Sequence, residues 1–158
     1  MPSTIKYCMY IILCILQTAC TDEKQGAEQQ IRDWVTAART QVEQPNPFGF
    51  KDMIADDYRD TNQLDKKMLH RRLTAYLLGH KNLHLYTQIK TIHLTDNKHA
   101  DVQVFIAMAG QTIHDTSALL NLKARSYLID LRLIKEDGDW QVSNADWRVA
   151  SVNELLNN

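Results

Sequence analysis

The sequence predicts an α+β domain, in which helices come first and an antiparallel sheet follows. Before Gly79, apolar residues recur at steps of three and four, which is typical of amphipathic helices. After Gly79 the period changes to two, which is typical of strands with one buried face. The connections between these strands are too short for crossover helices, so the strands must pair mainly antiparallel.

Three helices are predicted. The first covers residues 27–43, and its apolar stripe consists of Ile31, Trp34, Val35, Ala38 and Val42. The prolines of the following QPNPFG segment end it, because proline cannot continue the helical hydrogen bonds. A short second helix is expected within FKDMIADDY (50–58). The third is expected over residues 65–78, with Gly79 as its C-terminal cap.

Four long strands are predicted after Gly79. They correspond to NLHLYTQI and the residues after it, ADVQVFIAMA, KARSYLIDLRLIK and WQVSNADWRV. In the first strand the apolar phase slips between Ile89 and Ile92, which predicts a bulge. The EDGD segment predicts a tight hairpin turn between the last two strands.

Residues 1–19 have the features of a secretory signal peptide. Lys6 and the free amino terminus precede an apolar run that ends near Leu16. A membrane-spanning helix needs about 20 apolar residues, so this run is too short to cross a bilayer alone. Ordinary signal peptidase prefers an A-x-A-like site, and the residues before Cys20 supply only half of one.

The LQTAC segment (16–20) resembles the lipobox of bacterial lipoproteins, in which the cysteine is lipidated and becomes the first mature residue. Gln17 departs from that pattern because the usual leucine stands one position early. Cys20 would be the only cysteine left after cleavage, so no internal disulfide could form. The resemblance implies a membrane anchor at Cys20. Thr21, rather than Asp, implies the outer membrane of the bacterial cell envelope, facing the periplasm.

The remaining chain is the size of one domain. We expect a short tether over residues 20–26, a domain over 27–152 and a tail over 153–158. Loss of Lys6 changes the formal net charge from −1 to about −2. No clustered basic surface is evident, which argues against a nucleic-acid partner.

Residues 27–149 resemble the NTF2-like superfamily, which includes SnoaL-like and ketosteroid-isomerase-like proteins. The long first helix, MIADDYRD and above all YLIDLRLIKEDGDWQVSNADWR carry this resemblance. It implies a strongly curved sheet of four long strands, with room for a short fifth, wrapped as a cone around three helices. It also implies an apolar pocket in the open end. The scaffold hosts enzymes and binding proteins alike, so the resemblance does not decide between them.

An enzyme of this type would need a carboxylate in the pocket as acid or base. The weak candidates are Asp57, with Tyr58 beside it, and Asp146. An ordinary turn also explains the aspartates of DDYRD. Asp146 shares the phase of Trp140 and so would point inward, unless a bulge reverses it. Asp130 and Arg132 are expected together on the outer face as a surface pair. The ketosteroid isomerases' acid, base and tyrosine cannot be matched here.

Binding is the alternative function. Trp34, Tyr58 and Trp147 are candidates for lining a ligand pocket, although aromatics at this spacing also suit a core. Three apolar residues are expected on the convex face and are candidates for a protein-partner or homodimer surface: Tyr86, Phe105 and Leu128. The first helix, a tail or the long loop could cover them instead.

No metal or cofactor is expected. His80 and His84 have the spacing of a helical metal pair, but Gly79 should end the helix before them. We therefore expect a lipid-anchored cell-envelope protein whose domain binds a small ligand, such as a small apolar molecule, or a protein. The alternative is a SnoaL or ketosteroid-isomerase-type enzyme, an isomerase or a hydratase/dehydratase, that uses a pocket aspartate.

Overall fold

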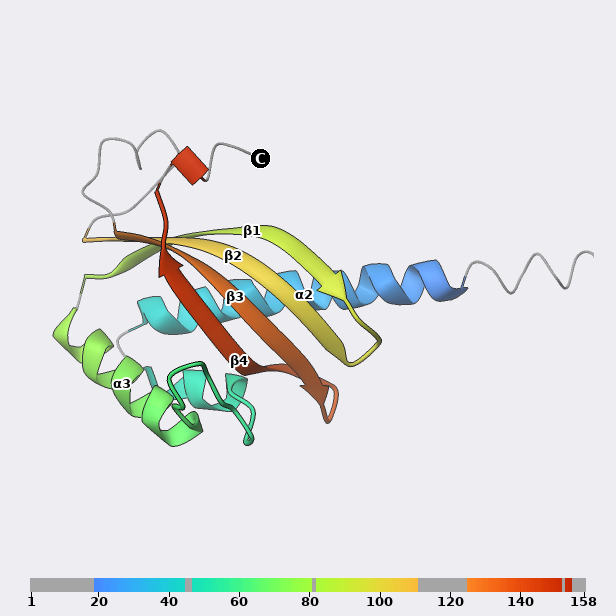
Figure 1. Ribbon diagram of the computed structural model, residues 1–158, viewed down its shortest axis with the longest axis horizontal. Helices are drawn as coiled ribbons and strands as arrows, with labels where there is room; N and C mark the ends of the chain where they lie inside the picture. The colour runs from blue at the N-terminus through green and yellow to red at the C-terminus, as the bar shows by residue number, and fades with distance from the viewer. Residues whose placement is uncertain (1–18, 45–46, 81, 111–124, 152, 155–158) are drawn as a thin grey trace, which may run out of the picture.

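The computed structural model describes residues 19–44, 47–80, 82–110, 125–151 and 153–154. Its elements are the helices α2 (Ala19–Glu43) and α3 (Lys66–Gly79), the 3-10 helix η1 (Pro47–Met53), and the strands β1 (His84–Leu94), β2 (His99–Ala109), β3 (Arg125–Glu136) and β4 (Asp139–Val149). The strands form one antiparallel sheet in the order β1-β2-β3-β4. The sheet is curved and twisted, and α2 runs behind it (Figure 1). The predicted α+β class is confirmed.

The helices differ from the prediction in three ways. Helix α2 begins at Ala19, so it includes residues 20–26, which we expected as a tether. The short second helix is a single 3-10 segment, η1, rather than an α-helix. Helix α3 is capped at its start by Asp65, whose side chain accepts the Met68 N–H at 2.8 Å. At its end Gly79 is still helical and His80 is the cap, so that prediction was one residue early.

The sheet contains two register shifts. The first lies between Ile89 and Thr91 of β1, where the sequence predicted a bulge. The second, which the sequence did not predict, lies in β4: Val142 pairs with Leu133 and Asn144 with Arg132, so Ser143 has no partner. A residue inserted in one strand reverses which face the following side chains occupy.

The β3–β4 hairpin turns at Asp137 and Gly138, as the EDGD segment predicted. Both residues have positive φ, 51° and 95°. This is the geometry of a type I′ turn, whose twist matches that of the flanking strands.

The inner face of the sheet, defined here as the face that packs against α2, holds the main core. Its fully buried large side chains come from α2, the segment after η1, and the strands: Ile31, Ile54, Tyr58, Val104 and Leu133. Residues after η1 run beside β4, where the Ala55 N–H donates to the Val142 carbonyl at 3.0 Å. This bridge occupies part of the β4 edge and takes the place of the short fifth strand that the resemblance allowed.

In the part of the chain described above, neither α2 nor α3 is both long enough and apolar enough to cross a bilayer.

We predict opposite effects for two glycine substitutions. Gly138→Ala should lower the free energy of unfolding by about 1–2 kcal/mol, because an L-residue is strained at a φ of 95°. Gly26→Ala, in α2 with open space around the new methyl group, should raise it by about 0.5–1 kcal/mol. Urea unfolding of the two variants checks both signs. Equal stability of Gly138→Ala and the parent protein would contradict the turn geometry.

Candidate ligand-binding site at the open end of the sheet

The interior of the cone is filled by packed side chains. Tyr58 is only 1% exposed and belongs to the same cluster as Ile31 and Trp140. Trp34 packs against this cluster, whereas Trp147 is 41% exposed. The three predicted pocket residues therefore do not surround a common space, and none of them lines either of the two hollows described below.

The predicted catalytic candidates are separated in the structure. Asp57 lies exposed in a turn, as the alternative explanation of DDYRD expected, and Tyr58 is in the core. Asp146 is exposed on the outer face, because the unpaired Ser143 reverses the phase of β4. The expectation that Asp146 points inward is therefore wrong for the reason that the sequence left open. These three residues do not form an acid–base site.

Asp60 is the buried carboxyl that sequence reasoning missed. It is 3% exposed; its Oδ1 accepts the Leu64 N–H at 2.8 Å, and its Oδ2 has no partner among the described residues. Burial, and then the charge of Asp60, raise the pKa of the Tyr58 phenol well above its usual range. The Tyr58 hydroxyl lies near the Ala145 backbone without the geometry of a full hydrogen bond. Asp60 lines neither of these two hollows, and the contact of its Oδ1 with the Leu64 N–H closes the loop between Asp60 and Leu64.

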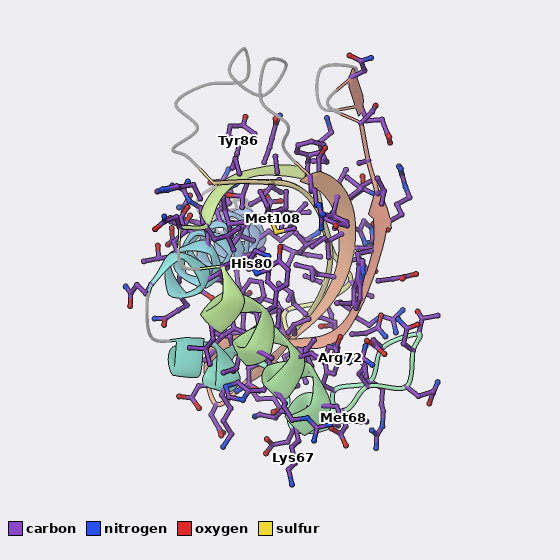
Figure 2. The ribbon with its side chains drawn as sticks, turned by 90° about the vertical axis from the view of Figure 1, so that its left-hand side faces the viewer. Lys67, Met68, Arg72, His80, Tyr86 and Met108 are labelled. Carbon is purple, nitrogen blue, oxygen red and sulfur yellow. The ribbon has the colours of Figure 1, made fainter. Side chains whose placement is uncertain are left out.

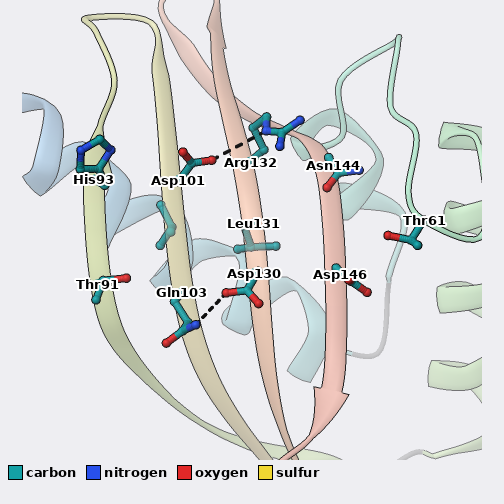
Figure 3. Close-up of a pocket in the computed structure, with 11 residues that line it drawn as sticks. Thr61, Thr91, His93, Asp101, Gln103, Asp130, Leu131, Arg132, Asn144 and Asp146 are labelled. Carbon is teal, nitrogen blue, oxygen red and sulfur yellow. Dashed lines mark hydrogen bonds and ion pairs between the residues drawn. The ribbon is translucent and has the colours of Figure 1, made fainter. Parts of the chain in front are cut away.

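One hollow, of about 440 Å³, lies on the outer face of the sheet, opposite α2 (Figure 3). Two rows of paired residues cross it, Thr91–Gln103–Asp130–Asp146 and His93–Asp101–Arg132–Asn144. Asp130 accepts a hydrogen bond from Gln103 at 2.8 Å, and Arg132 lies 3.7 Å from Asp101. Asp130 and Arg132 are therefore on the outer face as predicted, but they contact Gln103 and Asp101 rather than one another. The charged side chains of this hollow are exposed, and two contacts, Gln103–Asp130 and Asp101–Arg132, join some of its polar groups, as is typical of a solvated sheet surface.

The other part of the outer face is apolar and covered. Phe105 and Ala107 are fully buried, and Leu128 is 8% exposed. They form a second cluster with Ala150, and Tyr86 packs against it. Tyr86, Phe105 and Leu128 therefore lie on the outer face as expected, and they are covered there, which is one of the two alternatives that the sequence left open.

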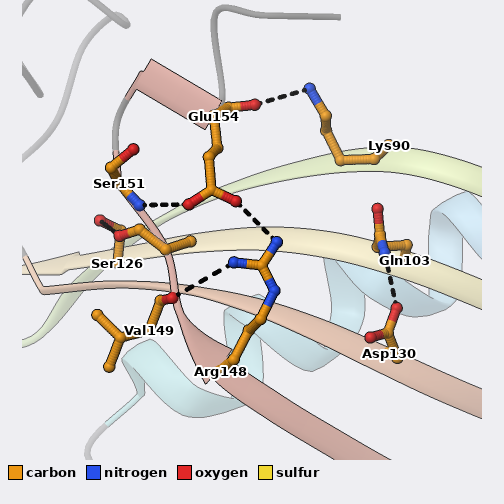
Figure 4. A network of polar contacts seen from close by, with 9 residues as sticks. Lys90, Gln103, Ser126, Asp130, Arg148, Val149, Ser151 and Glu154 are labelled. Carbon is orange, nitrogen blue, oxygen red and sulfur yellow. Dashed lines mark hydrogen bonds and ion pairs between the residues drawn. The ribbon is translucent and has the colours of Figure 1, made fainter.

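Polar contacts hold the chain after β4 beside this second cluster (Figure 4). The Ala150 backbone exchanges hydrogen bonds with Ser126, and Arg148 pairs with the Glu154 carboxylate at 2.7 Å. Glu154 also accepts the Ser151 N–H at 3.0 Å, while Lys90 donates to its backbone carbonyl at 3.4 Å. The Arg148 hydrogen bond, followed by that of Ser151, lowers the pKa of the Glu154 carboxyl.

The second hollow, of about 400 Å³, lies at the open end of the cone, between the end of α3 and the ends of the strands. Figure 2 looks onto this end, with His80 at one end of α3 and Lys67 at the other. Met108 of β2 and Leu83 contribute apolar surface, and Arg125 at the start of β3 contributes a cation. A volume of this size lies within the range of small-molecule sites.

One contact joins the end of α3 to the sheet, and two more order the side chains of that helix end. The rings of Tyr76 and His80 stack with their centroids 4.1 Å apart. The Tyr76 hydroxyl lies 3.9 Å from the Met108 sulfur, which connects the helix to β2. His80 Nδ1 lies 2.7 Å from the Tyr76 carbonyl. Because a carbonyl only accepts, Nδ1 carries the hydrogen, and Nε2 is the remaining polar atom of the ring.

His80 is the cap of α3 and His84 begins β1, so the two residues do not lie on one face of a helix. Within the described ranges, no three His, Cys, Asp or Glu side chains are grouped as metal ligands.

Several solved structures share this fold. A candidate scytalone dehydratase from Novosphingobium aromaticivorans matches with a TM-score of 0.67 and 13% identity, over 83% of this chain and 89% of that one. A hexachlorocyclohexane dehydrochlorinase from Novosphingobium barchaimii matches with a TM-score of 0.61 and 10% identity, over 82% and 90%. An NTF-2-like protein of unknown function from Shewanella oneidensis matches with a TM-score of 0.57 and 12% identity, over 76% and 97%.

No protein-family model and no curated protein matches the sequence. The chain has the NTF2-like fold, as its sequence predicted. At these identities the likeness concerns the fold alone, so function has to be argued from the site.

We predict that the chain after β4 loosens in acid. The depressed pKa of Glu154 means that its contribution to stability is present above the ordinary glutamate value of about 4.3 and is lost as pH falls below it. The Ser151 amide resonance, followed by NMR, should titrate with a midpoint below that value. Glu154→Gln should abolish this titration, whereas Glu28→Gln in α2 should leave it unchanged. A midpoint at or above the ordinary value would contradict the Arg148–Glu154 contact.

Proposed function

We propose that this protein is a lipid-anchored binding module of the bacterial cell envelope, and that it holds a small ligand in the hollow at the open end of the cone. The observation that carries the proposal is that apolar surface and polar groups occur together in one hollow, the one at the open end. The interior is packed, the outer hollow is a polar surface, and the open-end hollow combines apolar surface with a few polar groups. That combination is the usual composition of a small-molecule site.

The contacts of α3 support a preformed site. Tyr76 reaches Met108 from the helix, and His80 stacks on Tyr76, so two side chains of one wall are already ordered. Ordering side chains before a ligand arrives lowers the entropy lost on binding. The ligand would therefore meet a surface that needs little rearrangement.

The anchor part of the proposal rests on the first twenty residues. The apolar run, the small residues at 18–19 and Cys20 resemble a lipoprotein signal. Two or three acyl chains, at about 0.8 kcal/mol for each buried methylene, would hold the domain at a membrane surface. Helix α2 would then start directly at the lipidated residue.

A SnoaL-type or ketosteroid-isomerase-type enzyme is the second candidate. The names of two structural neighbours, a dehydratase and a dehydrochlorinase, favour it. Such an activity could not use Asp57, Tyr58 and Asp146 together. It would have to rest on the buried Asp60 beside Tyr58, neither of which lines a hollow described here.

We predict that filling the hollow weakens the binding of an uncharged apolar probe. N-phenyl-1-naphthylamine, whose fluorescence rises in apolar surroundings, should bind the parent protein. Met108→Trp should weaken this binding at least about tenfold, since its ring occupies the apolar part of the hollow. Leu78→Trp adds the same ring at a 61% exposed position of α3 and should bind as the parent does. Unchanged affinity in Met108→Trp would contradict the site.

We predict acylation at Cys20. Mass spectrometry of protein extracted from bacterial membranes should show a chain that starts at residue 20 and carries the added mass of lipid. Cys14→Ser, which changes the segment that is removed, should leave this mass unchanged, whereas Cys20→Ala should lose the modification. Retention of Met1, or a free thiol at Cys20, would contradict the anchor.

A further inference from the structure

The cation of the open-end hollow stands next to its apolar surface. Arg125 and Met108 are directly paired across β2 and β3, and Met108 is paired with Leu85 of β1 on its other side. Directly opposed residues of antiparallel strands have their side chains on the same face, about 5 Å apart at Cβ. The side chains of Arg125 and Met108 therefore leave the backbone at adjacent positions on the inner face.

Arg125 is exposed, and it is not paired with an acidic side chain in the part of the chain that the structure describes. Among the residues that the structure describes, no Asp or Glu lines the open-end hollow, whereas three aspartates line the outer one. The open end is thus the hollow with positive character.

Two carbonyls at the negative end of α3 are satisfied within the chain. The last carbonyls of a helix carry partial negative charge and would repel an anion if they were unsatisfied. Here the backbone N–H of His80 donates to the Leu77 carbonyl at 3.1 Å, and its ring donates to the Tyr76 carbonyl. Asn82, which also lines the hollow, adds a side-chain amide that can donate.

From this arrangement we infer that the ligand is a small amphipathic carboxylic acid. Its carboxylate contacts the Arg125 guanidinium, which presents two parallel donors to such a group. Its hydrocarbon part lies on Met108 and Leu83, beside the ring of Tyr76. This inference rests on the proposed function, because it names the chemical class that the proposed site takes.

Binding of decanoate tests the inference, with decylammonium as the probe of equal length and opposite charge. Decanoate should bind and should shift the Met108 methyl resonance in an NMR titration. Decylammonium should bind at least about tenfold more weakly. Arg125→Gln should weaken decanoate binding about tenfold, as expected for loss of one charge-assisted contact, and Arg125→Lys should restore part of it.

Two control variants test whether the loss of decanoate affinity is specific to Arg125. Arg72→Gln removes an exposed arginine nearer the opposite end of α3 (Figure 2) and should leave decanoate affinity unchanged. Asp146→Asn changes the outer hollow and should also leave it unchanged. Equal affinity of Arg125→Gln and the parent, or equal affinity for decanoate and decylammonium, would overturn the inference. If the neutral naphthylamine probe still depends on Met108 in that case, the site stands and only the ligand class is wrong.

Discussion

Which side chains of β4 face the core and which face solvent depends on the register of this strand, because Ser143 has no partner in β3. Before this residue, Trp140 and Val142 point into the core. After it the phase is reversed, so Ala145 packs inward while Asp146 lies outside. The same reversal places Arg148 where it can reach Glu154. Without the shift, the charges of the late strand would be directed into an apolar interior, at a high cost in desolvation.

Core packing then determines how much space inside the fold remains for a ligand. Each large apolar side chain that is fully buried contributes about 1.5–3 kcal/mol to the stability of the folded state. Most side chains of the inner face belong to this core or pack against it. A deep cavity would give up several such contacts in a domain of modest size. At the open end the packing is less complete. Helix α3 contacts the sheet there through Tyr76 and Met108, and the second hollow lies beside this contact.

The sequence predicted those features that one strand or helix displays by itself. The β1 bulge was visible because apolar residues stand on both sides of it, and the β3–β4 turn because Asp-Gly suits positive φ. The β4 shift was hidden, since the residues around it, Ser143 and Asn144, are polar and show no apolar phase. The burial of Phe105 and of Asp60 depends on segments that meet only in the folded chain, and the hollow beside Arg125 depends on three of them.

Strand alternation separates the two hollows electrostatically. Arg125 and Asp130 belong to the same strand but, five residues apart, they occupy opposite faces of the sheet. A carboxylate approaching the outer face meets Asp101, Asp130 and Asp146 as well as Arg132, whereas at the open end it meets Arg125, and no Asp or Glu is among the described residues that line that hollow. Both fields are screened over about 8–10 Å in physiological salt, so each acts on ligands close to its own hollow. The ligand proposed above would thus meet a cation and apolar surface in the same hollow.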